Sequence, residues 1–93
     1  MISITLDENN LSLAVSGHAD YAPKGYDIVC SAVSSLVYVL CTCEGKEIDD
    51  GERWIISINE SELNRAVFTA VADGLYAVAQ TYPNNVEIKP LVQ

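Results

Sequence analysis

Two short segments at the start of the chain alternate apolar and polar residues, and this pattern constrains the fold more than any other feature. Apolar residues fill every second position of residues 2–6, and residues 11–16 repeat the pattern. Such alternation is typical of strands with one buried face. Residues 7–10 between them are Asp-Glu-Asn-Asn, and asparagine tolerates the positive φ of tight turns. The sequence therefore predicts a β-hairpin whose second strand leads directly to the only histidine, His18.

Two longer segments have the apolar spacing of helices. In residues 28–43, apolar side chains recur every three or four positions, and Asp27 stands where an N-cap belongs. Gly45 has the place of the C′ residue that ends such a helix. A second helix is expected within residues 59–82, which open on a capping-box pattern. Gly74 lies inside this second segment, so we expect close packing against a neighbouring element there.

Short strands at residues 53–58 and 86–89 complete the predicted order β-β-α-β-α-β, and the acidic segment 47–52 is expected to be an exposed loop. This order is typical of a small α+β fold, with a mostly antiparallel sheet and two helices packed on one face. A chain of 93 residues is long enough for one hydrophobic core. Residues 1–93 are therefore expected to form a single domain.

The balance of charges argues against several classes of function. Thirteen acidic and five basic residues give a net charge of −8, which repels phosphate backbones, so nucleic-acid binding is not expected. The negative charge either keeps a small protein soluble or steers a basic partner, and solubility is the simpler interpretation. No apolar run approaches the roughly 18 residues of a membrane span, and no signal peptide is evident. We therefore expect a cytoplasmic protein that does not contact a membrane.

The three cysteines are an odd number in a chain without an export signal, which indicates a reducing compartment and free thiols. On a helix, Cys41 and Cys43 would point about 200° apart and could not share a metal ion. With a single histidine besides, the sequence predicts no metal site and no cofactor. Cys41 and Cys43 are interpreted as small buried apolar groups.

His18 and Cys30 are the candidates for a base and a nucleophile. Cys30 falls in the first turn of the predicted helix, where unpaired backbone amides favour negative charge, and the reactive form of cysteine is the thiolate. His18 follows the second strand, so both residues are expected at the same end of the sheet. By residue type alone, a lone histidine and a lone cysteine are more often structural than catalytic.

Asp27 has two possible roles beside this pair. It can cap the helix by accepting backbone amides, or it can orient His18 as the third member of a triad, and capping is favoured. An amide occupied by Asp27 cannot bind an oxyanion. The oxyanion donors would then have to include loop amides near Gly25 and Tyr26.

Ser34 and the loop before the helix leave further alternatives open. Ser34 lies one turn after Cys30 and can bond to His18 or to the Cys30 carbonyl, of which the second is more usual for a helical serine. Tyr21 and Tyr26 make the loop aromatic. Such a loop can close over a bound peptide and exclude water, or it can be an ordinary surface loop.

One block of the sequence reads Gly17-His18-Ala19 and then Gly25-x-Asp27-Ile28-Val29-Cys30-x-Ala32-Val33-Ser34-x-Leu36. A weaker likeness continues through Gly74-Leu75 and Tyr82-Pro83. Together these motifs resemble the ribosomal-processing cysteine protease family, Prp, and the resemblance covers most of the chain.

The resemblance implies a homodimer of the α+β fold predicted above. It also implies an endopeptidase that removes a short N-terminal extension from a large-subunit ribosomal protein precursor, cutting beside an aromatic residue. By this resemblance His18 and Cys30 are the catalytic dyad. Asp27 and Ser34 match family positions that support the dyad. Gly17 and Gly25 match family positions at which the backbone is constrained.

Two functions from different classes therefore stay open. In an endopeptidase, the Cys30 thiolate attacks the peptide carbonyl, and His18 protonates the leaving amine and then activates water. The alternative is a catalytically weak, dimeric protein-binding module of the same fold, in which Cys30 would be buried and inert. A thiol redox sensor is disfavoured because no resolving cysteine lies near Cys30 in the sequence.

Overall fold

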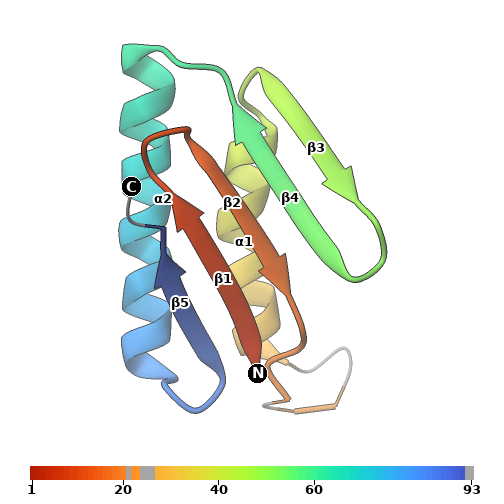
Figure 1. Cartoon of the computed structure of the whole chain (residues 1–93). Coiled ribbons are helices and arrows are strands. Elements are labelled where there is room, and N and C mark those ends of the chain that lie inside the picture. Colours follow the sequence, from red (N-terminus) through yellow and green to blue (C-terminus); the bar gives the residue numbers. More distant parts are fainter. Residues whose placement is uncertain (21, 24–26, 92–93) are drawn as a thin grey trace.

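A computed structural model of the chain describes residues 1–20, 22–23 and 27–91. Within these residues the chain forms one five-stranded sheet of order β3-β4-β2-β1-β5, and two helices cover one of its faces (Figure 1). The β1–β5 pair is parallel, and the other three pairs are antiparallel. The predicted fold class, a mostly antiparallel sheet with two helices on one face, is confirmed.

The elements follow one another without long connections, except between β2 and α1. Their bounds are β1 Ile2–Asp7, β2 Ser12–Ser16, α1 Ile28–Cys41, β3 Gly45–Asp49, β4 Arg53–Ile58, α2 Glu62–Thr81 and β5 Val86–Pro90. The predicted hairpin is present, with Asp7 opposite Ser12 across its turn. The positive φ of this turn, 48°, falls on Leu11 and not on either asparagine, and Leu11 is buried in the core.

One strand was not expected from the sequence. Gly45–Asp49 forms β3, an edge strand paired with β4, where the acidic segment was interpreted as a loop. All five of its residues are exposed, so it lacks the buried alternation by which strands are recognised. The helix also ends earlier than predicted, at Cys41, and Thr42 is its C-cap.

Gly45 consequently has a different role from the helix-ending one predicted for it. A Cβ atom at this position would lie 2.1 Å from the Ser57 carbonyl oxygen and 2.7 Å from Ile58 Cα. Glycine is therefore required by the close approach of β3 to β4.

The core lies between the helices and the sheet. The buried residues of α1 are mostly valines, whose low helix propensity is offset by burial against the strands. Gly74 of α2 faces Leu36 of α1, and an added Cβ would lie 3.1 Å from the leucine side chain, which confirms the expected close packing. The buried residues of the two helices are Val29, Val33, Val37 and Leu40 of α1, and Phe68, Val71, Ala72 and Leu75 of α2.

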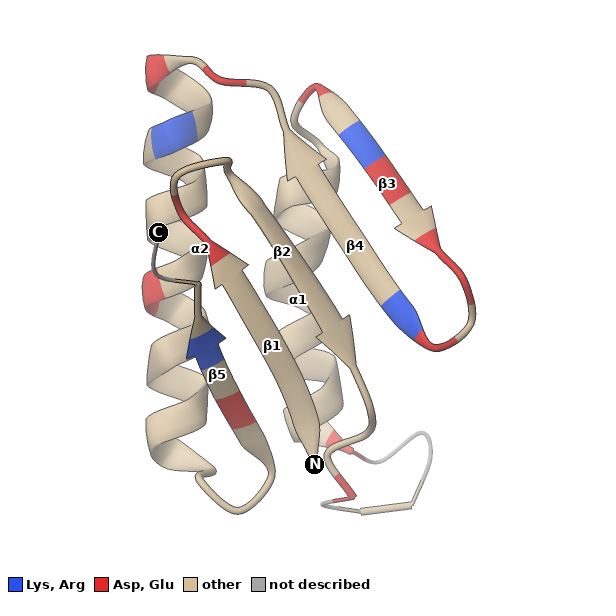
Figure 2. Ribbon diagram, in the orientation of Figure 1, with Lys and Arg blue, Asp and Glu red and all other residues tan. Residues whose placement is uncertain are grey.

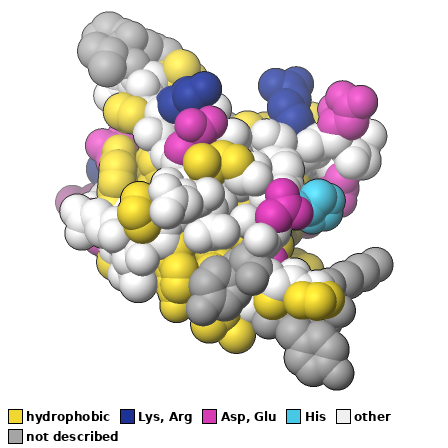
Figure 3. Space-filling model, turned by 90° about the horizontal axis from the view of Figure 1, so that it is seen from below, with side chains coloured by type: hydrophobic (Ala, Val, Ile, Leu, Met, Phe, Trp, Pro, Cys, Tyr) yellow, Lys and Arg dark blue, Asp and Glu magenta, His cyan; other side chains and the backbone are white. Residues whose placement is uncertain are grey.

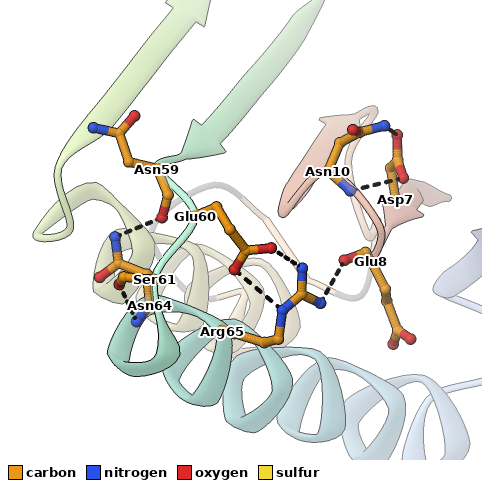
Figure 4. A network of polar contacts seen from close by, with 8 residues as sticks. All are labelled: Asp7, Glu8, Asn10, Asn59, Glu60, Ser61, Asn64 and Arg65. Atoms are coloured by element: carbon orange, nitrogen blue, oxygen red, sulfur yellow. Dashed lines mark hydrogen bonds and ion pairs between the residues drawn. The ribbon is translucent and has the colours of Figure 1, made fainter.

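The start of α2 is joined to the hairpin turn by a polar network (Figure 4). Ser61, and not Asn59 of the predicted capping box, is the N-cap, and its Oγ accepts from the Asn64 amide at 3.0 Å. Arg65 forms an ion pair with Glu60 and donates from Nη1 to the Glu8 carbonyl at 3.2 Å. This network fastens the end of the molecule that lies opposite the β2–α1 connection (Figure 1).

Candidate thiol site

β2 and α1 deliver His18 and Cys30 to the same end of the sheet (Figure 1). β2 ends at Ser16, and Gly17 then turns the chain with a φ of +82°. A Cβ at Gly17 would lie 2.3 Å from the Met1 carbonyl oxygen, so both the backbone angle and the space demand glycine. His18 follows this fixed turn and its side chain is exposed.

The first turn of α1 holds Cys30. Asp27 is its N-cap: one carboxylate oxygen, Oδ1, accepts from the Val29 amide at 3.0 Å and from the Cys30 amide at 2.9 Å. The capping role favoured from the sequence is thus the one observed. Because the Cys30 amide already donates to the Asp27 carboxylate, it is not free to bind another group beside the Cys30 thiol.

The Cys30 thiol contacts the segment that carries His18. The Ala19 amide donates to Cys30 Sγ at 3.4 Å, and the Ala19 side chain is only 1% exposed. This contact places the backbone beside His18 directly against the sulfur. Cys30 itself is half-buried, so it is neither sealed in the core nor fully open to solvent.

One pocket of about 310 Å³ joins these groups. Gly17, His18, Cys30 and Ser34 all line it, so the structure brings together four of the residues singled out in the sequence. Its remaining lining residues are Ile2, Val15, Ser16 and Val33 on the side of the core, and Asp49, Gly51, Glu52, Arg53 and Trp54 from the β3–β4 hairpin.

The β3–β4 hairpin forms the opposite wall of the pocket, which the sequence did not indicate. Trp54 is fixed there by an edge-to-face contact with Tyr38 of α1, with ring centroids 5.1 Å apart, and by a hydrogen bond from Nε1 to Glu47 Oε1 at 2.6 Å. The turn itself is held by Asp50, whose carboxylate accepts from the Arg53 amide at 2.7 Å. This hydrogen bond, with a similar one from Glu52, holds the pKa of Asp50 below its ordinary value.

The wall has more negative than positive charge. Among the described residues that line the pocket, Asp49 and Glu52 are acidic and Arg53 is the single Lys or Arg. The ribbon shows further acidic positions along this hairpin (Figure 2). Seen from this end, the histidine is exposed with acidic side chains near it (Figure 3). A ligand that enters the pocket therefore meets a surface that favours positive over negative groups.

Three residues predicted near the site, Tyr21, Gly25 and Tyr26, lie outside the described residues. The expected oxyanion donors from the loop amides around Gly25 and Tyr26 fall in the same segment. Within residues 1–20, 22–23 and 27–91, no group of three or more His, Cys, Asp or Glu side chains could hold a metal ion. In that same part of the chain, neither helix is long and apolar enough to cross a bilayer.

The other two cysteines are far from this pocket but close to each other. The sequence argument that separated them assumed a helix as far as Cys43, whereas α1 ends at Cys41. Both side chains line a second, smaller pocket of about 130 Å³ at the opposite end of α1. Burial, with a further contribution from Glu47, raises the pKa of the Cys41 thiol. A raised pKa leaves less of the nucleophilic thiolate at neutral pH.

The sequence also gave no indication of Asn85. Its side-chain Nδ2 donates to the Ala19 carbonyl at 2.8 Å, although the two residues are 66 positions apart. Asn85 falls between the predicted second helix and the last predicted strand. No local pattern marks a side chain whose partner is brought to it by the parallel pairing of β1 with β5.

The arrangement suits nucleophilic attack on a carbonyl. A half-buried thiol lines an open pocket, a backbone amide donates to its sulfur, and an imidazole lines the same pocket. Nucleophile and proton-transfer group are the two components that covalent hydrolysis of an amide requires.

Comparison with known proteins agrees with this chemistry. A family model described as cysteine protease Prp matches residues 1–87. A relative from Mycoplasma genitalium, the ribosomal processing cysteine protease Prp, is 34% identical over 95 residues, which cover 95% of this chain and 94% of that protein. The corresponding protein of Mycoplasma pneumoniae is 47% identical over 38 residues, 41% of this chain and 36% of that protein.

Solved structures agree in fold. A Streptococcus mutans protein, 27% identical, superimposes with a TM-score of 0.79 and covers 100% of this chain and 96% of its own. The essential ribosomal processing protease Prp from Staphylococcus aureus, in complex with a covalently linked product peptide, is 20% identical with a TM-score of 0.80. That alignment covers 98% of this chain and 100% of the other, and at this identity it supports the fold alone.

Proposed function

Because this chain belongs to the cysteine protease Prp family, we propose that it is a cysteine endopeptidase that processes a ribosomal protein. The specific reaction proposed is removal of a short N-terminal extension from a large-subunit ribosomal protein precursor. The observation that carries the proposal is the shared pocket of His18 and Cys30, with the Ala19 amide donating to Cys30 Sγ.

In the proposed first step, the Cys30 thiolate attacks the scissile carbonyl carbon. A C–S bond forms, and the carbonyl π electrons move to the oxygen. When the tetrahedral intermediate collapses, the C–N bond breaks, and the His18 imidazolium gives its proton to the departing amine. The products are the released C-terminal fragment and a thioester on Cys30.

In the second step, neutral His18 removes a proton from water, and the resulting hydroxide attacks the thioester carbonyl. The C–S bond breaks, the thiolate with imidazolium is restored, and the new carboxylic acid releases its proton to solvent and leaves as the carboxylate. The Ala19 amide supplies a hydrogen bond to the sulfur in the resting site, and such bonds strengthen when the acceptor is charged.

Asp27 and Ser34 have indirect roles in this proposal. Asp27 fixes the first turn of α1 by capping it, so it positions Cys30 through the Val29 and Cys30 amides. Ser34 lines the pocket one turn after Cys30 and is available to a bound peptide or to His18. Gly17 fixes the turn before His18, for the reasons of space and backbone angle given above.

The substrate side of the proposal rests on charge and on the relatives. The acidic residues Asp49 and Glu52 in the pocket favour a basic peptide, and ribosomal proteins are typically basic because they bind RNA. We further propose a homodimer acting in the cytoplasm, where ribosomal precursors are made. Sedimentation of the purified protein at several concentrations measures the oligomeric state.

The decisive experiment measures cleavage of a synthetic peptide that spans the extension and first mature residues of a large-subunit ribosomal protein precursor. We expect Cys30→Ala to abolish cleavage, and His18→Ala to reduce it by about 10²- to 10⁴-fold through loss of proton transfer. Cys41→Ala is the matched control, since it removes a thiol from the same helix in a different pocket, and it should cleave normally.

Undiminished cleavage by Cys30→Ala would end the proposal. Binding of the peptide by the wild-type protein without cleavage would instead favour the protein-binding module. That alternative required Cys30 to be buried, whereas Cys30 is half-buried and lines the pocket.

A further inference from the structure

We propose that Asn85 is a positioning residue for the thiol site, acting through Ala19 on Cys30. The inference rests on the proposed function for its catalytic meaning, but its geometry involves only this chain. Asn85 lies in the turn between α2 and β5, on the other side of β1 from β2. Its side chain reaches across to the segment that carries His18.

Asn85 is itself firmly held. Its backbone amide donates to the Tyr82 carbonyl at 3.0 Å, and its backbone carbonyl accepts from the Ile2 amide at 2.8 Å. The first bond joins it to the end of α2, and the second joins it to the start of β1. The side chain therefore projects from a rigid part of the sheet.

The segment that receives this side chain has little preference of its own for the observed path. It leaves β2 through Gly17, and three residues later Asp20 has a φ of 55°. Aspartate tolerates the left-handed conformation better than most residues with a side chain but does not favour it, so contacts elsewhere help to hold the segment in place. The Asp20 carboxylate lies 3.5 Å from the Met1 amino group, but both groups are exposed, and such pairs contribute little.

Ala19 is where the stronger contacts meet. Its carbonyl accepts from Asn85 Nδ2 at 2.8 Å, and its amide donates to Cys30 Sγ at 3.4 Å. These two bonds hold opposite sides of one buried residue. The carbonyl and the amide belong to the two peptide planes on either side of the Ala19 Cα, so a bond to each restricts both backbone torsions of Ala19 and, with them, the placement of the preceding residue, His18.

Asn85 does not line the pocket that contains His18 and Cys30. Its influence on the reaction is consequently indirect, through the placement of Ala19. Loss of the side-chain amide leaves the Ala19 carbonyl, on a residue that is 1% exposed, without this donor. The segment is then expected to shift, and a misplacement of about 1 Å in a reacting group can cost about 10²-fold in rate.

The test compares Asn85→Ala and Asn85→Asp with Asn84→Ala. Asn85→Asp has nearly the same shape, but its carboxylate accepts hydrogen bonds and cannot donate one to the Ala19 carbonyl. Asn84→Ala is the matched control, because Asn84 is the exposed neighbour in the same turn. Three readouts are used: kcat and KM for the precursor peptide, the rate at which iodoacetamide alkylates Cys30 relative to Cys41 in the folded protein, and hydrogen exchange of the Ala19 amide.

We expect both Asn85 variants to lower kcat by about 10- to 100-fold with KM changed less than about twofold, because the reacting groups and not the peptide contacts are displaced. The Cys30 alkylation rate should change at least threefold while that of Cys41 does not. Hydrogen exchange of the Ala19 amide should accelerate at least tenfold, with amides of β1 unaffected. Asn84→Ala should match the wild type in every readout.

Wild-type kcat, alkylation and Ala19 exchange in Asn85→Asp would overturn the inference. A uniform change in Cys30, Cys41 and β1 would also overturn it, because that result means general destabilisation. The alkylation and exchange readouts do not require peptidase activity. If the wild-type protein fails to cleave while Asn85→Asp still changes Cys30 and Ala19 selectively, the proposed function fails and the positioning role stands.

Discussion

The N-cap of α1 offers the sharpest prediction about how the fold supports the site. Asp27→Ala removes the oxygen that accepts from the Val29 amide at 3.0 Å and from the Cys30 amide at 2.9 Å. Replacing an N-cap residue by alanine costs about 0.5–2 kcal/mol. The first turn of α1 contains no other acidic residue to interact with the helix dipole, so we expect a loss above the low end of this range, at about 1–2 kcal/mol.

Asp27→Asn separates capping from a role for the charge. Asparagine caps helices about as well as aspartate, so this variant should unfold within about 0.5 kcal/mol of the wild type. It should also keep most of its activity, because the structure uses Asp27 as an acceptor of backbone amides. If the carboxylate were needed to orient His18, Asp27→Asn would instead lose cleavage by orders of magnitude with its stability intact.

Urea unfolding followed by circular dichroism measures the free energies, and cleavage of the precursor peptide measures activity. A loss of 1 kcal/mol corresponds to a decrease in Tm of about 4–8 °C for a domain of 60–100 residues, so the effect of Asp27→Ala is well resolved in a chain of 93. The reasoning is refuted if Asp27→Ala unfolds within about 0.3 kcal/mol of the wild type. It is also refuted if Asp27→Asn is destabilised as much as Asp27→Ala.

Three further predictions follow from particular contacts. Gly17→Ala should lower the free energy of unfolding by at least about 2 kcal/mol in a urea titration, because it adds a left-handed residue to a steric overlap with backbone, and a loss below about 0.5 kcal/mol would contradict this. Glu60 is stabilised as a carboxylate by Arg65, which lowers its pKa, so Glu60→Gln should be less stable than the wild type at neutral pH. That difference should vanish as the pH falls through the lowered pKa, and a difference that persists in acid would refute the assignment. Because burial and then Glu47 raise the pKa of Cys41, Glu47→Gln should modestly accelerate iodoacetamide alkylation of Cys41 near pH 8, as followed by peptide mass spectrometry, and an unchanged or slower rate would contradict the charge effect.

Much of the fold could be predicted from local patterns. The β1–β2 hairpin could be predicted because apolar residues alternate in both strands, with Ile2, Ile4 and Leu6 of β1 and Leu13 of β2 buried. The helix α1 could be predicted because Asp27 precedes a regular apolar stripe. β3 was missed because none of its five residues is buried; it is held by backbone pairing with β4 and by the hydrogen bond between the Trp54 and Glu47 side chains. The requirement for glycine at position 45 could not be predicted either, because it comes from the backbone of Ser57 on the neighbouring strand.

The candidate site, too, could be predicted only in part from the sequence. His18 and Cys30 could be selected from residue type, predicted position and resemblance to the Prp family, and they line one pocket. The wall that faces them could not be predicted, because it belongs to the β3–β4 hairpin whose first strand has no sequence signature. The contact of Asn85 with Ala19 could not be predicted for a related reason, because it forms only after β5 has paired with β1.

The most direct test of the central claim is to identify the residue that a substrate-like electrophile modifies. A peptide vinyl sulfone that ends in a phenylalanine analogue and has the sequence of a ribosomal precursor extension is incubated with the protein, and the adduct is located by mass spectrometry after digestion. We predict one adduct, on Cys30, which is lost in Cys30→Ala and strongly slowed in His18→Ala. An adduct on Cys41 or Cys43 at an equal rate, or unchanged labelling in His18→Ala, would contradict a thiol and imidazole that act together.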